Sequence, residues 1–411
     1  MTLPNFDQSL NKYADLIIQK GANVQKGQTI ILYIAVDQAQ LAHKLVQAAY
    51  KRGANEVIVE WQDSFLQKEF LNHTDEKRLA VQPDYVKVRA DELMQKHATR
   101  ISVISGAPDT LKDVDAKRLA TYQGSMGLAK SAIRKATSNN DISWCVVAAA
   151  DAAWATQAFP ELAPEAATDK LWTEIFKTTR ADQPDPEAAW DKQIKLLSEK
   201  SDWLNQQQFT ALKYKSAKTD ITIGLPKNHA WEAAGSNDLA GNFFIPNMPT
   251  EEVFTAPDNR RIDGTISSTL PLSYAGTLIE GITLQFKAGK IVAASADKGE
   301  DVLKHLIATD AGTRSLGEVS LVPQKSPIAE SGIIFLNTLF DENASDHIAI
   351  GEAYPFNLQG GTKMSAAELA EHGINVSQAH VDFMVGSDDM DIDGITAEGQ
   401  NVPIMRAGNW A

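Results

Sequence analysis

The chain of 411 residues contains a single cysteine, Cys145, so no disulfide can form within it. Proteins of oxidising compartments commonly carry paired cysteines, and the lack of a pair favours a reducing, cytoplasmic setting. Cys145 stands in the apolar segment ISWCVVAAA, where we expect a buried strand thiol rather than a nucleophile. The sequence also lacks a run of about 18 apolar residues and a charged-then-apolar signal pattern near its start. We therefore expect no membrane partner.

Positive charge is also scarce, because 39 Lys and Arg residues stand against 53 Asp and Glu residues, a net charge of −14. This balance disfavours nucleic acid as a main partner and is compatible with a cavity that attracts metal ions or protonated amines. The sequence contains no G-x-G-x-x-G after the first expected strand and no G-x-x-x-x-G-K-[ST] anywhere. Without such a glycine-rich turn, we expect neither a dinucleotide cofactor nor a P-loop phosphate site.

The N-terminal half alternates amphipathic helices with short β-rich apolar segments, a pattern typical of a parallel sheet with crossover helices. We expect strands at 28–36, 55–61, 100–105 and 142–150, and helices at 6–20, 38–53, 86–98 and 109–137. Between 151 and 206, Pro-rich breaks separate further amphipathic helices, as in a segment that joins domains. Because a chain of this length exceeds what one core usually serves, we place a separate α/β domain at 1–205.

The C-terminal half is richer in strands, and we expect an α+β domain at 206–411 that is dominated by antiparallel sheet. Its last strands are expected in LGEVSLVP (316–323), GIIFLNTLF (332–340) and QAHVDFMV (378–385). The residues KAGK (287–290) between two β-rich segments predict the turn of a hairpin.

Candidate metal ligands gather in this C-terminal part. His380 and Asp382 are two residues apart in an expected strand, so both side chains should point to the same face. An imidazole and a carboxylate together suit a divalent cation such as zinc, cobalt or manganese. Glu318, His347 and Tyr354 stand in or beside other strand-type segments. The grouping predicts a metal site formed by several strands.

Three other polar features need separate interpretations. Glu251 and Glu252 are adjacent and face opposite ways if the backbone is extended, so one enters a site while the other meets solvent or an arginine. The segment SDDMDIDG (387–394) resembles the start of an EF-hand loop, but Gln400 stands where the loop needs a bidentate Glu, and we expect a charged strand or turn. His372 precedes a glycine at an expected helix end, where the helix dipole alone favours a histidine.

The segments NMPTEEVFTAP, LGEVSLV, ASDHIAIGEAYP and AHVDFMVG resemble, in order and spacing, the thermophilic-type metalloaminopeptidase family, and within it most closely the PepS-type members. The resemblance extends over essentially the whole chain. It implies an N-terminal α/β domain, a C-terminal catalytic domain with an enclosed active site, and a homodimer. The activity it implies is metal-dependent release of N-terminal residues from short peptides with a free N-terminus.

The resemblance also implies a site for two divalent ions, zinc, cobalt or manganese. The implied ligands are Glu252, Glu318, His347, His380 and Asp382. Choosing Glu252 over Glu251 rests on its spacing to Glu318 within the family. Two cations about 3.5–4 Å apart can share a water molecule and lower its pKa to near 7, with Glu318 as the candidate bridge or base. Tyr354 is the implied catalytic tyrosine, since its O–H can donate to the developing oxyanion.

Two alternatives stay open at this point. One is another two-metal hydrolase, an amidase or a phosphodiesterase, with the same ligands and a different substrate. The other is a non-catalytic small-molecule binding protein built on the α/β domain, in which His380 and Asp382 have only structural roles.

Overall fold

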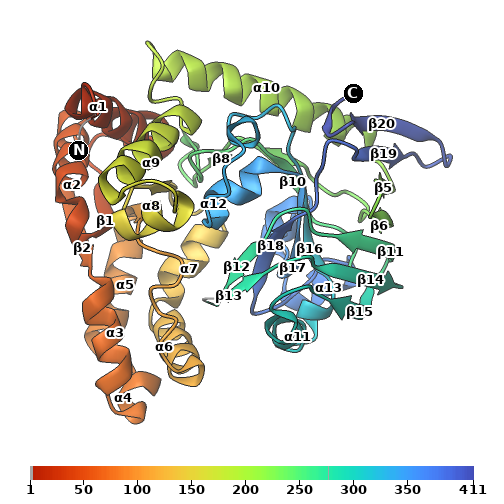
Figure 1. Ribbon diagram of the computed structural model, residues 1–411, viewed down its shortest axis with the longest axis horizontal. Helices are drawn as coiled ribbons and strands as arrows, with labels where there is room; N and C mark the ends of the chain where they lie inside the picture. Colours follow the sequence, from red (N-terminus) through yellow and green to blue (C-terminus); the bar gives the residue numbers. More distant parts are fainter. Residues whose placement is uncertain (1–2, 276) are drawn as a thin grey trace. The chain divides into compact units, whose positions relative to one another are not determined.

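The computed structural model describes residues 3–275 and 277–411 (Figure 1). The chain divides into two units, one with the chain up to Asp191 and Gly235–Pro249, the other with Lys192–Ala234 and Thr250–Ala411. The change between them lies within helix α10 (Pro186–Gln207). The expected domain boundary near residue 206, at the end of this helix, stays a prediction. None of the described helices is long and apolar enough to cross a membrane.

The first unit is built on a parallel sheet whose strands follow the order β2-β1-β3-β4. These strands are β1 (Thr29–Ala35), β2 (Glu56–Gln62), β3 (Thr99–Ile104) and β4 (Trp144–Ala148). The parallel sheet expected from the helix–strand alternation is thereby confirmed. Because β1 has β2 on one side and β3 on the other, the winding direction of the sheet reverses between β1 and β3.

The helices of the first unit connect and cover these strands. They are α1 (Phe6–Leu16), which continues as a π-helical turn (Ile17–Gly21), α2 (Ala39–Lys51), α3 (Ser64–His73), α4 (Glu76–Ala80), α5 (Asp84–Gln95), α6 (Ala116–Ala129), α7 (Ser131–Ser138), α8 (Ala152–Ala158) and α9 (Pro164–Thr178). The sequence patterns did not indicate α3 and α4. Both begin at an aspartate, Asp63 or Asp75, whose side chain accepts a hydrogen bond from a free N–H of the first turn. Figure 1 shows α3, α4 and α6 side by side at one end of this unit.

The second unit contains two antiparallel sheets, in agreement with the expected strand-rich half. The larger has the order β15-β14-β11-β6-β5-β19-β20-β21, with β5 (Ala211–Lys215), β6 (Asp220–Gly224), β11 (Ile262–Ser267), β14 (Thr283–Lys287), β15 (Lys290–Ser295), β19 (Asp391–Ile395), β20 (Asn401–Arg406) and β21 (Asn409–Trp410). The smaller has the order β18-β17-β16-β10-β7, with β7 (Glu232–Ala233), β10 (Val253–Thr255), β16 (Leu316–Leu321), β17 (His347–Gly351) and β18 (His380–Met384). The strands β14 and β15 form the expected hairpin.

Short elements complete the two units. Two strand pairs stand outside the main sheets, β8 (Ser236–Asn237) with β9 (Phe243–Phe244) and β12 (Leu272–Tyr274) with β13 (Thr277–Ile279). The α-helices of the second unit, besides the larger part of α10, are α11 (Glu300–Ile307), α12 (Thr338–Asp341) and α13 (Ala366–Glu371).

One expected strand, at 332–340, is wrong. This segment forms irregular backbone that leads into α12. The side chain of Asn337 caps the helix by accepting from the N–H of Leu339, and the Asp341 carboxylate accepts from the N–H groups of Phe335 and Asn337. These side chains satisfy the backbone locally, so the apolar segment needs no neighbouring strand.

Apolar side chains from both antiparallel sheets join in one buried cluster. In the smaller sheet, every second residue of β17 and β18 enters this cluster, namely Ile348, Ile350, Val381 and Phe383. The alternate positions of these strands therefore belong to the opposite face of the sheet.

Strand β16 keeps the same alternation only because it contains a bulge. Leu316 and Val319 are three residues apart and both enter the buried cluster, which a regular strand would not allow. The register with β17 shifts between Leu316 and Glu318, so Gly317 is the extra residue. A Cβ at Gly317 would lie 2.1 Å from the carbonyl oxygen of Glu352. The bulge thus requires glycine, and it assigns Glu318 to the face opposite the core.

We predict that Gly317→Ala lowers the free energy of unfolding by about 1–3 kcal/mol, since the backbone must shift to accept the methyl group. Urea unfolding followed by circular dichroism measures this. Gly124→Ala in α6 is the control, because nothing lies within 4 Å of a Cβ there. Equal stability of the Gly317→Ala and Gly124→Ala proteins would contradict the steric argument.

Candidate metal centre

Four neighbouring strands bring acidic and imidazole side chains to one face of the smaller antiparallel sheet. Glu318 pairs with Ala349, and Ala349 pairs with Asp382, so these three residues form one row across β16, β17 and β18. The central position of the row carries only a methyl group, which leaves space between the two carboxylates. In the neighbouring row, Ser320 lies opposite His347, and its hydroxyl donates to Oε2 of Glu252 at 2.8 Å.

The side chains form two groups that share Glu318. In one group, Nε2 of His347 lies 3.2 Å from Oε2 of Glu252 and 3.4 Å from Oε1 of Glu318. In the other, Nε2 of His380 lies 3.7 Å from Oε2 of Glu318 and 3.2 Å from Oδ1 of Asp382. Within each group one ligand atom per residue lies within 4.8 Å of the others, so a single ion can contact all three. The structure thus brings together every residue that the sequence indicated as a ligand.

Both imidazoles are oriented by backbone carbonyl groups. Nδ1 of His347 lies 3.2 Å from the carbonyl oxygen of Ser345, and Nδ1 of His380 lies 2.7 Å from that of Glu352. A carbonyl oxygen only accepts, so each Nδ1 carries a hydrogen and each Nε2 faces the carboxylates. When a metal ion displaces the proton on Nε2, that nitrogen is the atom left to bind it. Histidines that bind metals are commonly held this way by their second nitrogen.

The carboxylates are buried, so their negative charge needs a cation to compensate for it. Burial raises the pKa of Glu318 despite the hydrogen bond with His347. Burial disfavours a charged His380, but Asp382 and Glu318 outweigh it and raise the pKa of the imidazole to about 10. Oδ1 of Asp382 is buried and makes no contact with hydrogen-bond geometry, although His380 is near. The mixed N/O donor set, its spacing and this oxygen all fit divalent metal ions.

The two adjacent glutamates have different environments. Glu252 lies against His347, whereas Glu251 accepts a hydrogen bond at 2.8 Å from the side chain of Gln193. Solvent, one expected environment of the second glutamate, is wrong, because Glu251 is only 4% exposed. The two suggested arginines, Arg260 and Arg261, pair with Asp258 instead. Both glutamates directly precede β10, and their side chains contact different partners.

Tyr354 lies beside the group that contains His380, with their ring centroids 5.0 Å apart. Its ring stacks on Phe356 at 5.1 Å with an interplanar angle of 8°, and Phe254 packs edge-on against both. Burial, together with Glu318 and other carboxylates, raises the pKa of the Tyr354 phenol well above its usual range. The phenol therefore keeps its hydrogen and is able to donate it in a hydrogen bond.

Glu342 is a site residue that the sequence patterns did not indicate. It stands in a 3₁₀ turn (Glu342–Ala344) before β17. Burial raises the pKa of its carboxyl well above the usual range, and the charges of Asp382, Glu252 and Glu318 raise it further. Its position in DENASDH, five residues before His347, was the only available signal. Glu342 adds a further acidic group to the site.

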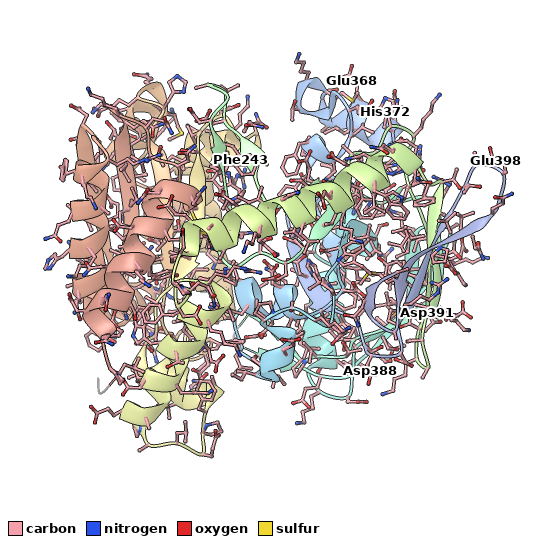
Figure 2. All side chains as sticks on the ribbon, turned by 90° about the horizontal axis from the view of Figure 1, so that it is seen from above. Phe243, Glu368, His372, Asp388, Asp391 and Glu398 are labelled. Carbon is pink, nitrogen blue, oxygen red and sulfur yellow. The ribbon has the colours of Figure 1, made fainter. Side chains whose placement is uncertain are left out.

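The other polar features lie in ordinary structural positions (Figure 2). Asp391 and Asp393 are part of strand β19, where Asp393 pairs with Arg406, so the charged strand expected for SDDMDIDG is confirmed. His372 follows the last residue of α13, which confirms the expected helix end. Cys145 is buried in β4, and burial raises the pKa of its thiol, as expected for a structural cysteine.

Comparisons with known proteins identify the family of this chain. The model of the family described as thermophilic metalloprotease (M29) matches residues 6–410. Aminopeptidase PepS of Streptococcus thermophilus is 49% identical, and aminopeptidase AmpS of Bacillus subtilis 47%, each over 100% of both chains. The solved structure of wild-type AmpT from Thermus thermophilus, 37% identical, superposes with a TM-score of 0.93 over 99% of this chain and 100% of that one.

These matches define a metal-dependent peptidase, and the buried histidines and carboxylates are a candidate site for its metal ions. The chain belongs to the thermophilic metalloprotease family M29.

We predict that Asp382→Asn lowers metal affinity at least about tenfold while the fold survives, because the amide keeps the volume but loses the charge. Metal content after gentle purification and calorimetric titration with zinc or cobalt measure the loss. Asp393→Asn on β19 is the control for removing one strand carboxylate. Unchanged metal affinity of the Asp382→Asn protein would show that this residue is not a ligand.

Proposed function

We propose that the chain removes N-terminal residues from short peptides with a water molecule activated by two divalent ions. Its class, a metalloaminopeptidase, follows from membership of M29 and from relatives over the full length that are named aminopeptidases. The observation that best supports two ions is the pair of ligand groups that share Glu318. Glu252 and His347 would hold one ion, His380 and Asp382 the other, and Glu318 would bridge them.

The bridging role of Glu318 is supported by the directions of its two oxygens. Oε1 is the oxygen nearer to His347 and Oε2 the one nearer to His380. A carboxylate in this position can contact two ions at once. Bound divalent ions supply Lewis acidity, which lowers the pKa of water and polarises the scissile carbonyl. Zinc, cobalt and manganese all suit this donor set.

Tyr354 is the proposed donor to the oxyanion that develops on the substrate carbonyl. Two features support this: its phenol keeps its hydrogen, and its ring is held between Phe356 and His380. A donor that is already in place needs no reorganisation when the negative charge develops, which is why such groups have large effects on rate.

The acidic surroundings suit recognition of a free α-amino group. Glu318, Asp382 and Glu342 gather acidic groups beside the proposed metal positions, and a nearby cation favours their charged forms. A protonated amine is favoured there by the same field that favours metal ions, whereas an N-blocked peptide lacks the charge.

Two further properties are part of the proposal. The single buried thiol suits a cytoplasmic location. The resemblance to the family supports a homodimer, which light scattering in solution would test.

We predict that the metal-loaded protein cleaves a leucyl p-nitroanilide at least about a hundredfold faster than its N-acetylated analogue, since only the first carries the α-amine. Absorbance of released nitroaniline measures both rates. Chelation should abolish the cleavage and added zinc or cobalt should restore it. Equal cleavage of the two compounds would instead indicate an amidase without aminopeptidase specificity.

We predict that Tyr354→Phe keeps the metal content and KM but lowers kcat about 10²–10³-fold, because it removes one oxyanion donor. Steady-state kinetics together with metal analysis separate these effects. Tyr85→Phe on the exposed surface of α5 serves as the matched substitution and should be fully active. Full activity of Tyr354→Phe would exclude the oxyanion role.

A further inference from the structure

One face of the parallel sheet in the first unit is apolar. The other face is mixed, with Ile31 packed against α5 and α7 and a polar part beside it. Alternate residues Ile30, Leu32 and Ile34 of β1 are fully buried, as is usual for a parallel sheet. On the other face, Tyr33 of β1 pairs with Glu60 of β2 and with Ser102 of β3. Arg100 stands two residues before Ser102 and therefore lies on the same face. Polar residues on three neighbouring parallel strands indicate that this part of the face is not buried under apolar side chains.

A cavity of about 620 Å³ opens over this polar part of the face. Tyr33, Arg100 and Ser102 line its floor, together with Gln62 and Ile104 at the carboxyl ends of β2 and β3. Its side is lined by Lys130 and by residues of α7. The volume lies within the usual range of small-molecule sites, about 300–1,000 Å³. The cavity also lies where the winding direction of the sheet reverses, between β1 and β3, the usual position of ligands in such sheets.

Two cations in the cavity face the same aromatic ring. The guanidinium of Arg100 lies 5.9 Å from the centroid of the Tyr33 ring and the ammonium of Lys130 lies 5.1 Å from it. Arg134 of α7 adds a third positive charge to the lining. Within the described part of the chain, no carboxylate forms an ion pair with Arg100 or Lys130, and the nearby Glu60 is paired with Arg89.

This arrangement leaves positive charge partly buried and uncompensated. Burial lowers the pKa of both Arg100 and Lys130, and Arg100 lowers that of Lys130 further, while Glu60 acts in the opposite direction. A tetrahedral oxyanion would compensate both cations and accept from the hydroxyl of Ser102, which itself accepts a hydrogen bond from Nε of Arg100 at 3.1 Å.

We propose that this cavity binds the phosphate group of a small molecule, through Arg100, Lys130 and the hydroxyl of Ser102. The site differs from a P-loop, since charged side chains on a sheet face replace the glycine-rich turn that the sequence lacks. Because the cavity is much larger than a phosphate ion, it has room for an organic part of the ligand. The proposal concerns the first unit and is independent of the peptidase activity proposed for the second.

The test is calorimetric titration of the full-length, metal-loaded protein with inorganic phosphate at constant ionic strength. We expect one phosphate per chain with a millimolar or tighter dissociation constant. The double variant Arg100→Gln/Lys130→Gln should bind at least tenfold more weakly. The double variant Lys87→Gln/Lys96→Gln, which removes two exposed lysines of α5 and its C-terminus, should bind like the unmodified protein.

Two outcomes would overturn the proposal. One is the lack of phosphate binding by the unmodified protein, and the other is equal binding by the Arg100→Gln/Lys130→Gln protein, which would place the phosphate elsewhere, for example at the metal ions. Because Arg100 is partly buried, its replacement can affect folding as well as binding. Lys130→Gln alone is therefore the second variant, and it should weaken binding with an unchanged melting temperature.

Discussion

The second unit depends on one electrostatic constraint, the burial of several carboxylates around two imidazoles. Each buried carboxylate costs several kcal/mol unless a counter-charge and hydrogen bonds compensate for it. Among the described residues, His347 and His380 are the basic side chains paired with these carboxylates, and both are fixed with their Nε2 atoms toward them. Divalent ions are the remaining compensation, so metal binding and the integrity of this face of the sheet are two consequences of the same charge imbalance.

The rigid support of the site is the packed side of the same sheet. Alternate residues of β17 and β18 anchor these strands in the apolar cluster, which holds the imidazoles and the carboxylate of Asp382 on the other side. The bulge at Gly317 turns Glu318 toward that side, and Ala349 leaves the space between Glu318 and Asp382. A site built on neighbouring strands is held more precisely than one on loops, which suits the binding of metal ions.

One cavity of the first unit presents the opposite charge, although the chain as a whole carries a net charge of −14. Arg100 and Lys130 over Tyr33 create a local positive field on one face of a parallel sheet. Fields of this kind act over about one Debye length, roughly 8 Å at physiological ionic strength, so net charge does not decide what a local site binds. A prediction from overall charge alone therefore describes the surface and not a particular cavity.

Local sequence patterns were sufficient to predict the parallel sheet, the antiparallel half, the hairpin at 287–290 and the shared face of His380 and Asp382. The reason is that alternation and turn residues act over a few positions. It failed where side chains satisfy the backbone, as at Asn337 and Asp341, and it did not indicate Glu342. Only the tertiary structure decided that Glu252 rather than Glu251 lies against His347, that Ala349 separates two carboxylates, and that Phe356 supports Tyr354. The physical reason is that these contacts depend on strand register and on a bulge, which join residues far apart in the chain and leave no periodic trace in the sequence.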